Sequence, residues 1–316
     1  MSQTSQFVWM NGKLVPFEEA TLHFMTPGLH YGIGVFEGIR CYQTSDGPAI
    51  FRLGDHLERL LQSARVLGFI ELPFSLSELT EATKMVVAAN GFAECYIRPL
   101  IYLAEGGWNL SVDCGVPHVG VAVWKWESYL GEEALQQGVR ANTASFTRHH
   151  PNASMTKAKI AGNYVNSVLA KTESRRLGFD EAIMLDPHGY VAECTGENLF
   201  LARNGVLYTP PTAAILDGIT RDTLLALARD LDVTVIEEHI SRDRLYTADE
   251  VFVCGTAAEV IALREIDFRP IGAGRTGPIC RKLQQGFREV TRGHHPRSAD
   301  WLEHVSVTEV GYGHGV

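Results

Sequence analysis

The sequence is poor in lysine, with seven lysines and 21 arginines among its 28 basic residues. A lysine amine can form a Schiff base with a carbonyl compound, which the arginine guanidinium does not do. Two of the seven, Lys157 and Lys159, stand in the segment 156–164, before a glycine and a tyrosine at the expected start of a helix. This segment is therefore the first place to look for covalent catalysis, although both lysines also fit the alternative of solvated loop charges.

The chain also lacks an excess of basic charge and any long apolar run. Its 28 Lys and Arg against 37 Asp and Glu give a formal charge of -9 and a pI of about 5.7, which argues against nucleic acid as a partner. No apolar run approaches the roughly 18 residues of a membrane helix. Residues 1–13 have no basic-then-apolar signal pattern. We expect a soluble, cytoplasmic protein without a membrane partner.

The six cysteines include no C-x-x-C pair. They are spread along the chain, which is typical of reduced, mostly buried thiols rather than of a disulfide framework or a zinc site. No metal is expected. The six positions are Cys41, Cys95, Cys114, Cys194, Cys254 and Cys280.

The order of the expected elements predicts an α+β protein of two domains. A length of 316 residues, with 45% hydrophobic and 21% charged residues, is enough for two globular domains of ordinary size. We place the smaller N-terminal domain at 1–127, an interdomain loop at 128–137, and the larger C-terminal domain at 138–316. Short strands outnumber those of a doubly wound fold, and a cleft between the domains is the expected place for the active site.

Local signals set the expected boundaries of the elements. The segment 7–10 followed by Asn11-Gly12 predicts a strand entering a hairpin turn, and Ser75 with Glu78 forms a capping box that opens a helix ending at Gly91. The other expected helices are 56–68, 162–177, 220–230 and 281–290. The other expected strands are 95–103, 115–124, 181–186, 190–193, 198–202 and 206–209.

Two segments have the composition of anion sites. In the segment 217–222, Thr220 fits a helix N-cap, and a helix N-terminus offers free N–H groups to a phosphate. The segment 254–259 joins small residues to the Thr256 hydroxyl, where backbone N–H groups can converge. Taken alone, each is more simply explained as an ordinary helix start or turn. Neither is a P-loop, because no lysine follows the glycine.

An acidic run, 193–198, holds Glu193 and Glu197 four residues apart. A carboxylate facing a pyridine nitrogen keeps that nitrogen protonated and makes the ring an electron acceptor. The two acids also fit a general acid and base, or a solvated strand edge. Their spacing does not choose among these alternatives.

The N-terminal block 30–40 alternates glycines with aromatic and apolar residues. Such a pattern lets the backbone approach a ligand while rings line a pocket, with a tightly packed strand as the alternative. Further along, Arg98 stands inside an apolar strand. An arginine there needs a carboxylate, either from the protein or from a substrate.

Taken in order, these motifs resemble one family. The chain is similar to the fold-type IV pyridoxal-phosphate-dependent aminotransferases, which have the D-amino-acid aminotransferase-like fold, and specifically to bacterial branched-chain amino-acid aminotransferases. The resemblance runs from about Val8 to Val305 and leaves out the last residues, 306–316. The matching blocks are 30–40, 56–60, 96–99, Lys159 with 162–164, 193–200, 218–222 and 255–259.

The resemblance implies a site for pyridoxal 5'-phosphate. Lys159 would form the Schiff base with the cofactor and move the substrate proton, and its spacing to the 162–164 block favours it over Lys157. Tyr164 would bind the ring hydroxyl oxygen and Glu193 the pyridinium nitrogen. The other cofactor contacts implied are Arg59, Thr256 and the N–H groups of Ile219 and Thr220 at the phosphate, and Leu216 at the ring face.

The resemblance also implies where substrate binds. The pocket residues implied are Tyr31, Phe36, Gly38, Trp126 and Tyr129 for an apolar side chain, Tyr96 with the backbone of Thr256 and Ala257 for the α-carboxylate, and Arg98 for the second carboxylate of glutamate or 2-oxoglutarate. Arg40 is expected to support its strand. The loop 105–110 departs from the family pattern through Trp108, which either narrows the side-chain site or is buried away from it.

The activity implied is transamination of L-leucine, L-isoleucine and L-valine with 2-oxoglutarate, in a homodimer or a higher homo-oligomer such as a hexamer. The rivals on the same fold are a D-amino-acid aminotransferase, an (R)-selective amine transaminase and 4-amino-4-deoxychorismate lyase. The rivals of other classes are a non-catalytic phosphate-ligand-binding protein and a cofactor-free lysine Schiff-base lyase. The block 31–38 together with Tyr96 and Arg98 favours the branched-chain substrate.

Overall fold

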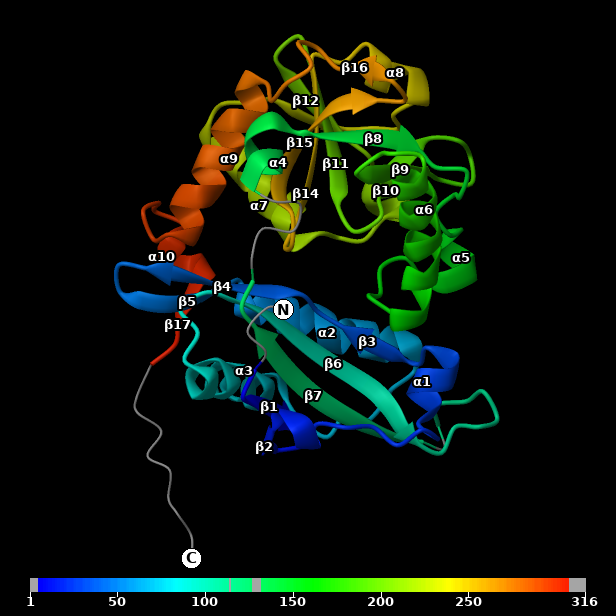
Figure 1. Ribbon diagram of the computed structural model, residues 1–316, viewed down its shortest axis with the longest axis vertical. Helices are drawn as coiled ribbons and strands as arrows, with labels where there is room; N and C mark the ends of the chain where they lie inside the picture. The colour runs from blue at the N-terminus through cyan, green and yellow to red at the C-terminus, as the bar shows by residue number, and fades with distance from the viewer. Residues whose placement is uncertain (1–4, 114, 127–131, 307–316) are drawn as a thin grey trace, which may run out of the picture. The chain divides into compact units, whose positions relative to one another are not determined.

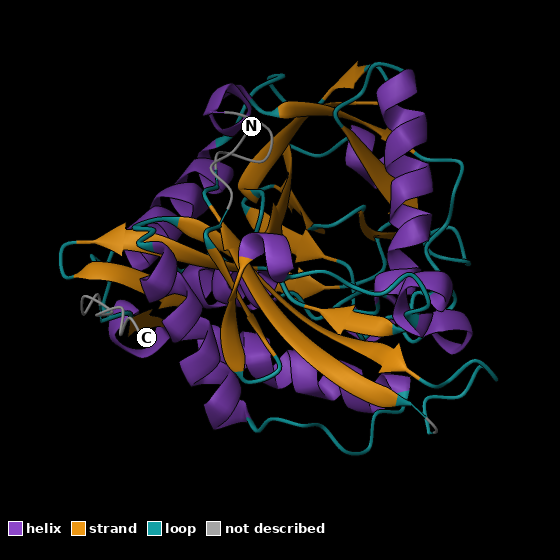
Figure 2. Ribbon diagram, turned by 60° about the horizontal axis from the view of Figure 1, so that its bottom comes forward, coloured by secondary structure: helices purple, strands orange, loops and turns teal. Residues whose placement is uncertain are grey.

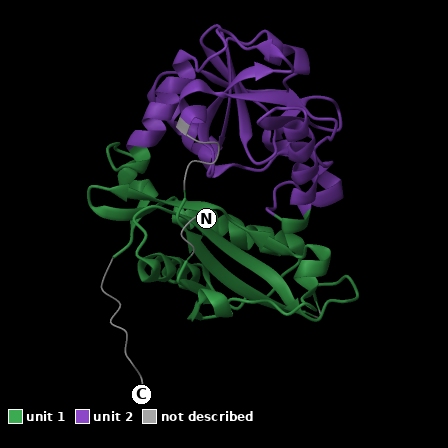
Figure 3. Cartoon of the chain, viewed as in Figure 1, with its two compact units in different colours: residues 1–126, 160–162, 290–316 green, residues 127–159, 163–289 purple. Residues whose placement is uncertain are grey.

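The computed structural model describes residues 5–113, 115–126 and 132–306 of the chain. Its contacts divide the chain into two compact units (Figure 3). Unit 1 comprises residues 1–126, 160–162 and 290–316, and unit 2 comprises residues 127–159 and 163–289. None of the described helices combines the length and the hydropathy that a bilayer crossing requires.

Unit 1 is built on one antiparallel eight-stranded sheet, in the order β17-β5-β4-β6-β7-β1-β2, with β3 paired to β6 (Figure 1). Its strands are β1 (Phe7–Met10), β2 (Lys13–Pro16), β3 (Gly34–Phe36), β4 (Ile39–Thr44), β5 (Gly47–Phe51), β6 (Cys95–Glu105), β7 (Val116–Trp124) and β17 (Leu302–His304). The C-terminal segment differs from expectation, which placed it in the second domain. Residues from 290 onward group instead with unit 1, where β17 pairs with β5.

The β1–β2 hairpin confirms the turn expected from the Asn-Gly pair. Met10 pairs with Lys13 across the turn. Both turn residues have positive φ, 46° at Asn11 and 98° at Gly12. Asparagine and glycine tolerate this left-handed conformation, which matches the twist of the two strands.

Two long helices pack on the sheet of unit 1, α2 (Leu53–Leu67) and α3 (Leu76–Asn90). The capping box at the start of α3 is confirmed, because the Ser75 hydroxyl accepts the Glu78 N–H at 3.4 Å and the Glu78 carboxylate accepts the Ser75 N–H at 2.8 Å. The core between helices and sheet includes Leu57, Leu60, Val86, Ile97, Ile101 and Val121. The short helices of the unit are η1 (Phe17–Glu19), α1 (Pro27–Tyr31) and α10 (Ser298–Trp301).

Unit 2 is built on a mixed nine-stranded sheet, in the order β10-β9-β8-β15-β14-β11-β12-β13, with β16 paired to β15 (Figure 1). Its strands are β8 (Val139–Thr143), β9 (Glu181–Leu185), β10 (Val191–Cys194), β11 (Asn198–Arg203), β12 (Val206–Thr209), β13 (Val235–Glu237), β14 (Glu250–Gly255), β15 (Glu259–Ile266) and β16 (Arg269–Pro270). Because β8 and β9 are parallel, the chain between them must cross over. That connection carries Lys159.

The helices of unit 2 are α4 (Glu132–Gln137), α5 (Pro151–Ser154), α6 (Tyr164–Arg176), η3 (Thr212–Ala214), α7 (Ile219–Asp230), α8 (Arg242–Tyr246) and α9 (Pro278–Thr291). The short helix η2 (Ala161–Asn163) lies mostly in residues 160–162, which belong to unit 1. Helices α6, α7 and α9 were expected and differ at their ends, whereas α4, α5 and α8 were not expected. The segment expected as the interdomain loop thus contains α4. Helix α9 begins three residues earlier than expected, because the Glu250 carboxylate accepts the N–H groups of Ile279 and Cys280, each at 2.9 Å. Both units combine strands with helices (Figure 2), which confirms the α+β class.

Candidate active site

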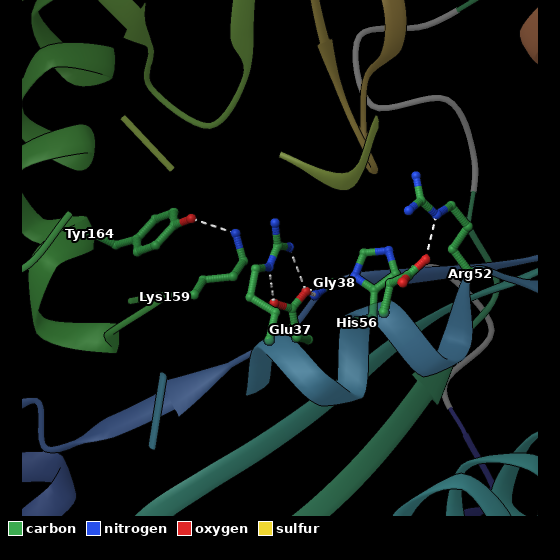
Figure 4. Close-up of polar contacts among 8 residues, drawn as sticks. Glu37, Gly38, Arg52, His56, Lys159 and Tyr164 are labelled. Atoms are coloured by element: carbon green, nitrogen blue, oxygen red, sulfur yellow. Dashed lines mark hydrogen bonds and ion pairs between the residues drawn. The ribbon is translucent and has the colours of Figure 1, made fainter. Parts of the chain in front are cut away.

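Lys159 lies in the crossover connection of unit 2, five residues before Tyr164, where α6 begins. Its Nζ donates a hydrogen bond to the Tyr164 Oη at 2.6 Å, and Figure 4 shows the two side chains meeting end to end. The Asn163 side chain donates to the Ser154 carbonyl at 2.6 Å, which fixes the chain around Lys159. A half-buried amine held by a phenol oxygen is suited to nucleophilic and proton-transfer chemistry.

The segment that follows Lys159 packs closely on the glycine-rich N-terminal block within unit 1. The Gly162 N–H donates to the Gly32 carbonyl at 3.2 Å. A Cβ at Gly32 would lie 2.8 Å from the Gly162 Cα, and Gly32 has a φ of 66°. Only glycine satisfies both demands. The close backbone approach expected in the block 30–40 is therefore made, at this glycine, to residues 160–162 of the chain itself.

Lys157 has a different environment. Its Nζ lies 2.6 Å from the Asp217 Oδ1, and the two side chains are 41% and 59% exposed. An exposed ion pair of this kind leaves the amine in contact with solvent. The geometry thus favours Lys159 as the reactive amine.

Glu193 lies on β10 and is buried. Its Oε1 lies 2.7 Å from the Arg148 Nη2, and its Oε2 accepts from the Asn198 Nδ2 at 3.2 Å. The Asn198 amide also donates to the Leu216 carbonyl at 3.1 Å. Burial raises the pKa of Glu193, while Arg148, the Leu216 N–H and the charge of Lys159 oppose that rise. Three of the implied cofactor residues, Lys159, Glu193 and Leu216, are thus neighbours.

Glu193 is one of three buried carboxylates in this region, the others being Glu181 and Glu197. Two cations form ion pairs with them: Lys171 pairs with Glu181, and Arg148 pairs with Glu193. The Glu197 carboxylate accepts the N–H of the preceding residue, at 3.1 Å. Burial and, next, the charge of Glu181 raise the pKa of Glu197 to about 8. Sequence reasoning missed both cations, although the scarcity of lysine was a signal for Lys171.

The implied phosphate contacts Ile219 and Thr220 form the first turn of α7. The expectation that Thr220 caps this helix is wrong, because the N-cap is Gly218, with φ of -71° and ψ of 126° and no side-chain cap. A Cβ at Gly218 would lie 1.9 Å from the Asn198 Oδ1, so glycine is required there for steric reasons. The first N–H groups of a helix have no acceptor within it and attract anions. The contact with Asn198 ties this helix start to Glu193.

Thr256 and Ala257 lie in the tight turn between β14 and β15. The turn is close to the acidic run 193–198, because a Cβ at Gly255 would lie 3.2 Å from the Gly196 carbonyl oxygen. The second segment proposed as an anion site therefore lies beside the strand end that carries Glu193.

Five of the implied substrate residues form one cluster in unit 1. The Arg98 guanidinium lies 4.7 Å from the Phe36 ring centre and 5.4 Å from that of Tyr96. The Tyr96 and Trp126 rings are 4.5 Å apart, and a Cβ at Gly38 would lie 1.9 Å from the Tyr96 Oη. The Arg98 Nε is buried and has no hydrogen-bond partner among the described residues. This guanidinium, framed by rings, is suited to a carboxylate.

Tyr31 belongs to a different aromatic group of unit 1. Its ring lies 5.8 Å from that of Trp108 and 6.5 Å from that of His30. Tyr31 is 44% exposed and Trp108 is 42% exposed. Trp108 is therefore not buried away from the implied side-chain site, but packs edge-on against one of its members. Tyr129, another implied member, lies outside the described residues.

Arg59 lies on α2, and its side chain is held by Glu37, a buried acid whose role sequence reasoning missed. The Glu37 carboxylate lies 2.7 Å from the Arg59 Nε and 2.9 Å from its Nη2. The His56 Nδ1 lies 2.8 Å from the same carboxylate (Figure 4). Burial alone would raise the pKa of Glu37, but Arg59, with His56, lowers it well below its usual range. Glu37 is thus an ionised carboxylate that fixes the direction of the Arg59 side chain.

Five of the six cysteines lie in the described part of the chain, and all five are buried and free. Within residues 5–113, 115–126 and 132–306, no group of three or more His, Cys, Asp or Glu side chains is arranged to hold a metal ion.

Comparison with known proteins gives matches along nearly the whole chain. The family model for amino-transferase class IV matches residues 34–266. The branched-chain-amino-acid aminotransferase of Pseudomonas aeruginosa is 48% identical over 301 residues, which cover 95% of this chain and 98% of that protein. The corresponding protein of Escherichia coli strain K12 is 43% identical over 307 residues, which cover 96% and 99%.

Solved structures match equally widely. The T.th. branched-chain amino acid aminotransferase with pyridoxamine 5'-phosphate has a TM-score of 0.92 at 48% identity, over 96% of this chain and 99% of that one. Its complex with N-(5'-phosphopyridoxyl)-L-glutamate has a TM-score of 0.91 at 46% identity, with the same coverage. The Escherichia coli enzyme has a TM-score of 0.92 at 42% identity, over 96% and 100%. The expected fold is thereby confirmed.

Proposed function

We propose a function from the premise that this chain belongs to the amino-transferase class IV family. It transfers the amino group of L-leucine, L-isoleucine or L-valine to 2-oxoglutarate with pyridoxal 5'-phosphate as cofactor, giving branched 2-oxo acids and L-glutamate. The observation that carries the proposal is the Lys159 amine, 2.6 Å from the Tyr164 phenol and close enough to the buried Glu193 to influence its ionisation. The branched-chain enzymes that align along nearly the whole chain support the substrate class.

The residues of unit 2 fit this cofactor group by group. Its aldehyde requires an amine, which is Lys159, and its ring oxygen requires a donor, which is Tyr164. Its ring nitrogen requires an acid, and the buried Glu193 offers its Oε2, which lies 3.2 Å from the Asn198 amide nitrogen. Its phosphate requires N–H groups, which the first turn of α7 presents beside Asn198. When bound, the cofactor supplies an aromatic ring that accepts the electrons left behind when the substrate Cα loses its proton.

A side chain of the protein carries the proton that the substrate Cα loses. The Lys159 Nζ would hold the cofactor through its aldehyde carbon and, as a free amine, would accept and carry the proton that the substrate Cα loses. For this step the amine must be neutral and correctly aimed, and the Tyr164 Oη holds it in place. The buried Glu193 would keep a proton on the ring nitrogen of the bound cofactor. Because the amino group is transferred in two half-reactions, the kinetics are expected to be ping-pong.

Two other groups of residues select the substrate. Tyr96 and the backbone of Thr256 and Ala257 bind the α-carboxylate, and the aromatic residues around Phe36 accept a branched side chain. Arg98 binds the second carboxylate of 2-oxoglutarate or glutamate. The buried Nε of Arg98, which lacks a hydrogen-bond partner among the described residues, supports this role.

The proposal is tested by cofactor absorbance and a substrate panel. The purified protein is expected to be yellow with pyridoxal phosphate and to form L-glutamate from L-leucine and 2-oxoglutarate. A colourless protein whose absorbance does not change when pyridoxal phosphate is added would contradict the proposal. Turnover restricted to D-amino acids or to (R)-amines would instead identify one of the two rival aminotransferases.

Arg98→Ala is expected to raise the KM for 2-oxoglutarate by about 10- to 50-fold and that for L-leucine by less than about threefold. Only the dicarboxylate would lose a charged partner. Steady-state kinetics with each substrate varied in turn measures the difference, and Arg98→Lys is expected to recover part of it. Equal losses for both substrates would show that Arg98 is structural.

Gly38→Ala is expected to lower kcat/KM for L-leucine by about 10- to 100-fold, because a small misplacement of a binding group is enough for such a loss. The new methyl group would lie 1.9 Å from the Tyr96 Oη and would push the ring away. The matched control is Gly120→Ala on β7, where the nearest atom is 3.7 Å from the added Cβ. Wild-type kinetics in Gly38→Ala would remove Tyr96 from the proposed carboxylate site.

We further propose that the enzyme is a cytoplasmic homodimer or a higher homo-oligomer. Large apolar side chains exposed within one short stretch of unit 1 support an assembly: Phe17, Leu22, Phe24, Met25, Leu29 and Tyr31. Light scattering of the purified protein measures the number of chains, and a monomer at working concentration would contradict this part of the proposal.

A further inference from the structure

We propose that Arg148 is a positioning residue, which keeps Glu193 ionised and aimed at the ring nitrogen of the cofactor. This inference rests on the function proposed above. Arg148 does not touch the reacting atoms. It sets the charge and the direction of Glu193, which binds the cofactor.

The geometry of Arg148 is that of a fixed support. Its backbone N–H donates to the Leu185 carbonyl at 2.8 Å, which anchors its loop to the end of β9. Its Nη2 lies 2.7 Å from the Glu193 Oε1, and the two side chains are 11% and 7% exposed. Its Nη1 lies 3.5 Å from the Ser167 Oγ on α6. The guanidinium therefore contacts one oxygen of Glu193 and leaves the Oε2 to the Asn198 amide and a ligand.

The charges around Glu193 explain why this support is needed. Burial raises the pKa of Glu193, and the first influence that opposes the rise is the charge of Arg148. A second half-buried cation of the region, Lys171, pairs with Glu181. A protonated Glu193 would present a neutral acid to the ring nitrogen, whereas an ionised Glu193 forms a charge-assisted hydrogen bond with a protonated ring nitrogen.

The test separates support of Glu193 from general support of the fold. Dissociation constants are measured for pyridoxal phosphate and for its carbocyclic analogue, in which CH replaces the ring nitrogen, with wild-type protein and with Arg148→Gln, Glu193→Gln and the double variant. Arg148→Gln is expected to raise the dissociation constant of pyridoxal phosphate about tenfold and that of the analogue less than about twofold. The double variant is expected to bind pyridoxal phosphate no more weakly than Glu193→Gln alone, because both changes remove the same interaction.

Two further variants serve as controls for this interpretation. Arg148→Lys keeps the charge and is expected to recover most of the affinity. Arg140→Gln is the matched control, because it removes an arginine that pairs with Glu265 at 2.7 Å in the same sheet, and it is expected to change neither constant. An equal rise in both dissociation constants for Arg148→Gln, or additive losses of affinity in the double variant, would overturn the role proposed for Arg148. Such a result would leave the proposed function of the enzyme intact. Wild-type protein that binds neither compound would overturn the proposed function itself.

Discussion

Lys159→Ala is expected to lower the turnover of L-leucine with 2-oxoglutarate by at least about 10⁴-fold, because it removes the residue proposed as both the nucleophile and the base of the reaction. Lys157→Ala is expected to change turnover by less than about twofold, because it removes one exposed ion pair. The two lysines are two residues apart but differ in environment. Lys159 is half-buried against Tyr164, whereas Lys157 is 41% exposed and pairs with Asp217.

Steady-state rates and covalent trapping measure this difference together. Borohydride reduces the bond between the cofactor and its lysine, so peptide mass analysis is expected to find the reduced adduct on Lys159 in wild type and in Lys157→Ala. No adduct is expected in Lys159→Ala. An inactive Lys157→Ala beside an active Lys159→Ala would move the nucleophile to Lys157 and would remove the role proposed for Tyr164.

The parts of the fold that were predictable from sequence are those set by neighbours along the chain. The turn at Asn11-Gly12 follows from two residues that tolerate positive φ. The capping box of Ser75 and Glu78 likewise acts over three residues, and both features form as expected. The longer helices and several strands, such as α2, α3, β6 and β7, were also found, because hydrophobic periodicity is a local property. The central strands β14 and β15 of unit 2 were not predicted.

Features that depend on distant residues were not predictable. The C-terminal strand β17 pairs with β5 across about 250 residues, and no local pattern indicates that partner. Thr220 was expected to cap α7 because hydroxyl side chains favour that position. The N-cap is instead Gly218, and a Cβ at that position would lie 1.9 Å from the Asn198 Oδ1. The steric demand for glycine at position 218 comes from this tertiary contact, which no local pattern indicates.

The candidate site shows the same division. The order of motifs indicated Lys159, Tyr164 and Glu193, and the structure brings these residues of unit 2 together. The order of motifs did not indicate the charged side chains that hold candidate residues in place, which are Arg148 for Glu193 and Glu37 for Arg59. Arg148 and Glu37 each pair with a residue far along the chain, and an isolated arginine or glutamate in a sequence carries no sign of its partner.

Glu197→Gln is expected to stabilise the protein, and the gain is expected to grow with pH. In the folded protein burial and the charge of Glu181 raise the pKa of Glu197 to about 8, from an ordinary value of 4.5. Between these two values the unfolded chain has released the proton while the folded protein still holds it. The folded state binds more protons, so the free energy of unfolding falls as pH rises through this window. A glutamine keeps the shape of the neutral acid and cannot ionise.

The expected gain is less than about 1 kcal/mol at pH 5 and about 3 to 4 kcal/mol at pH 8, and the latter corresponds to a rise of roughly 4–6 °C in the unfolding midpoint of a chain of this length. The shift of the midpoint is measured by thermal unfolding at both pH values, with saturating pyridoxal phosphate in every sample. Glu133→Gln replaces an exposed glutamate of the same unit and is expected to leave the midpoint unchanged at either pH. A gain for Glu197→Gln that is the same at pH 5 and pH 8 would mean that Glu197 is already ionised in the folded protein. Lys171 would then have to balance two buried carboxylates rather than Glu181 alone.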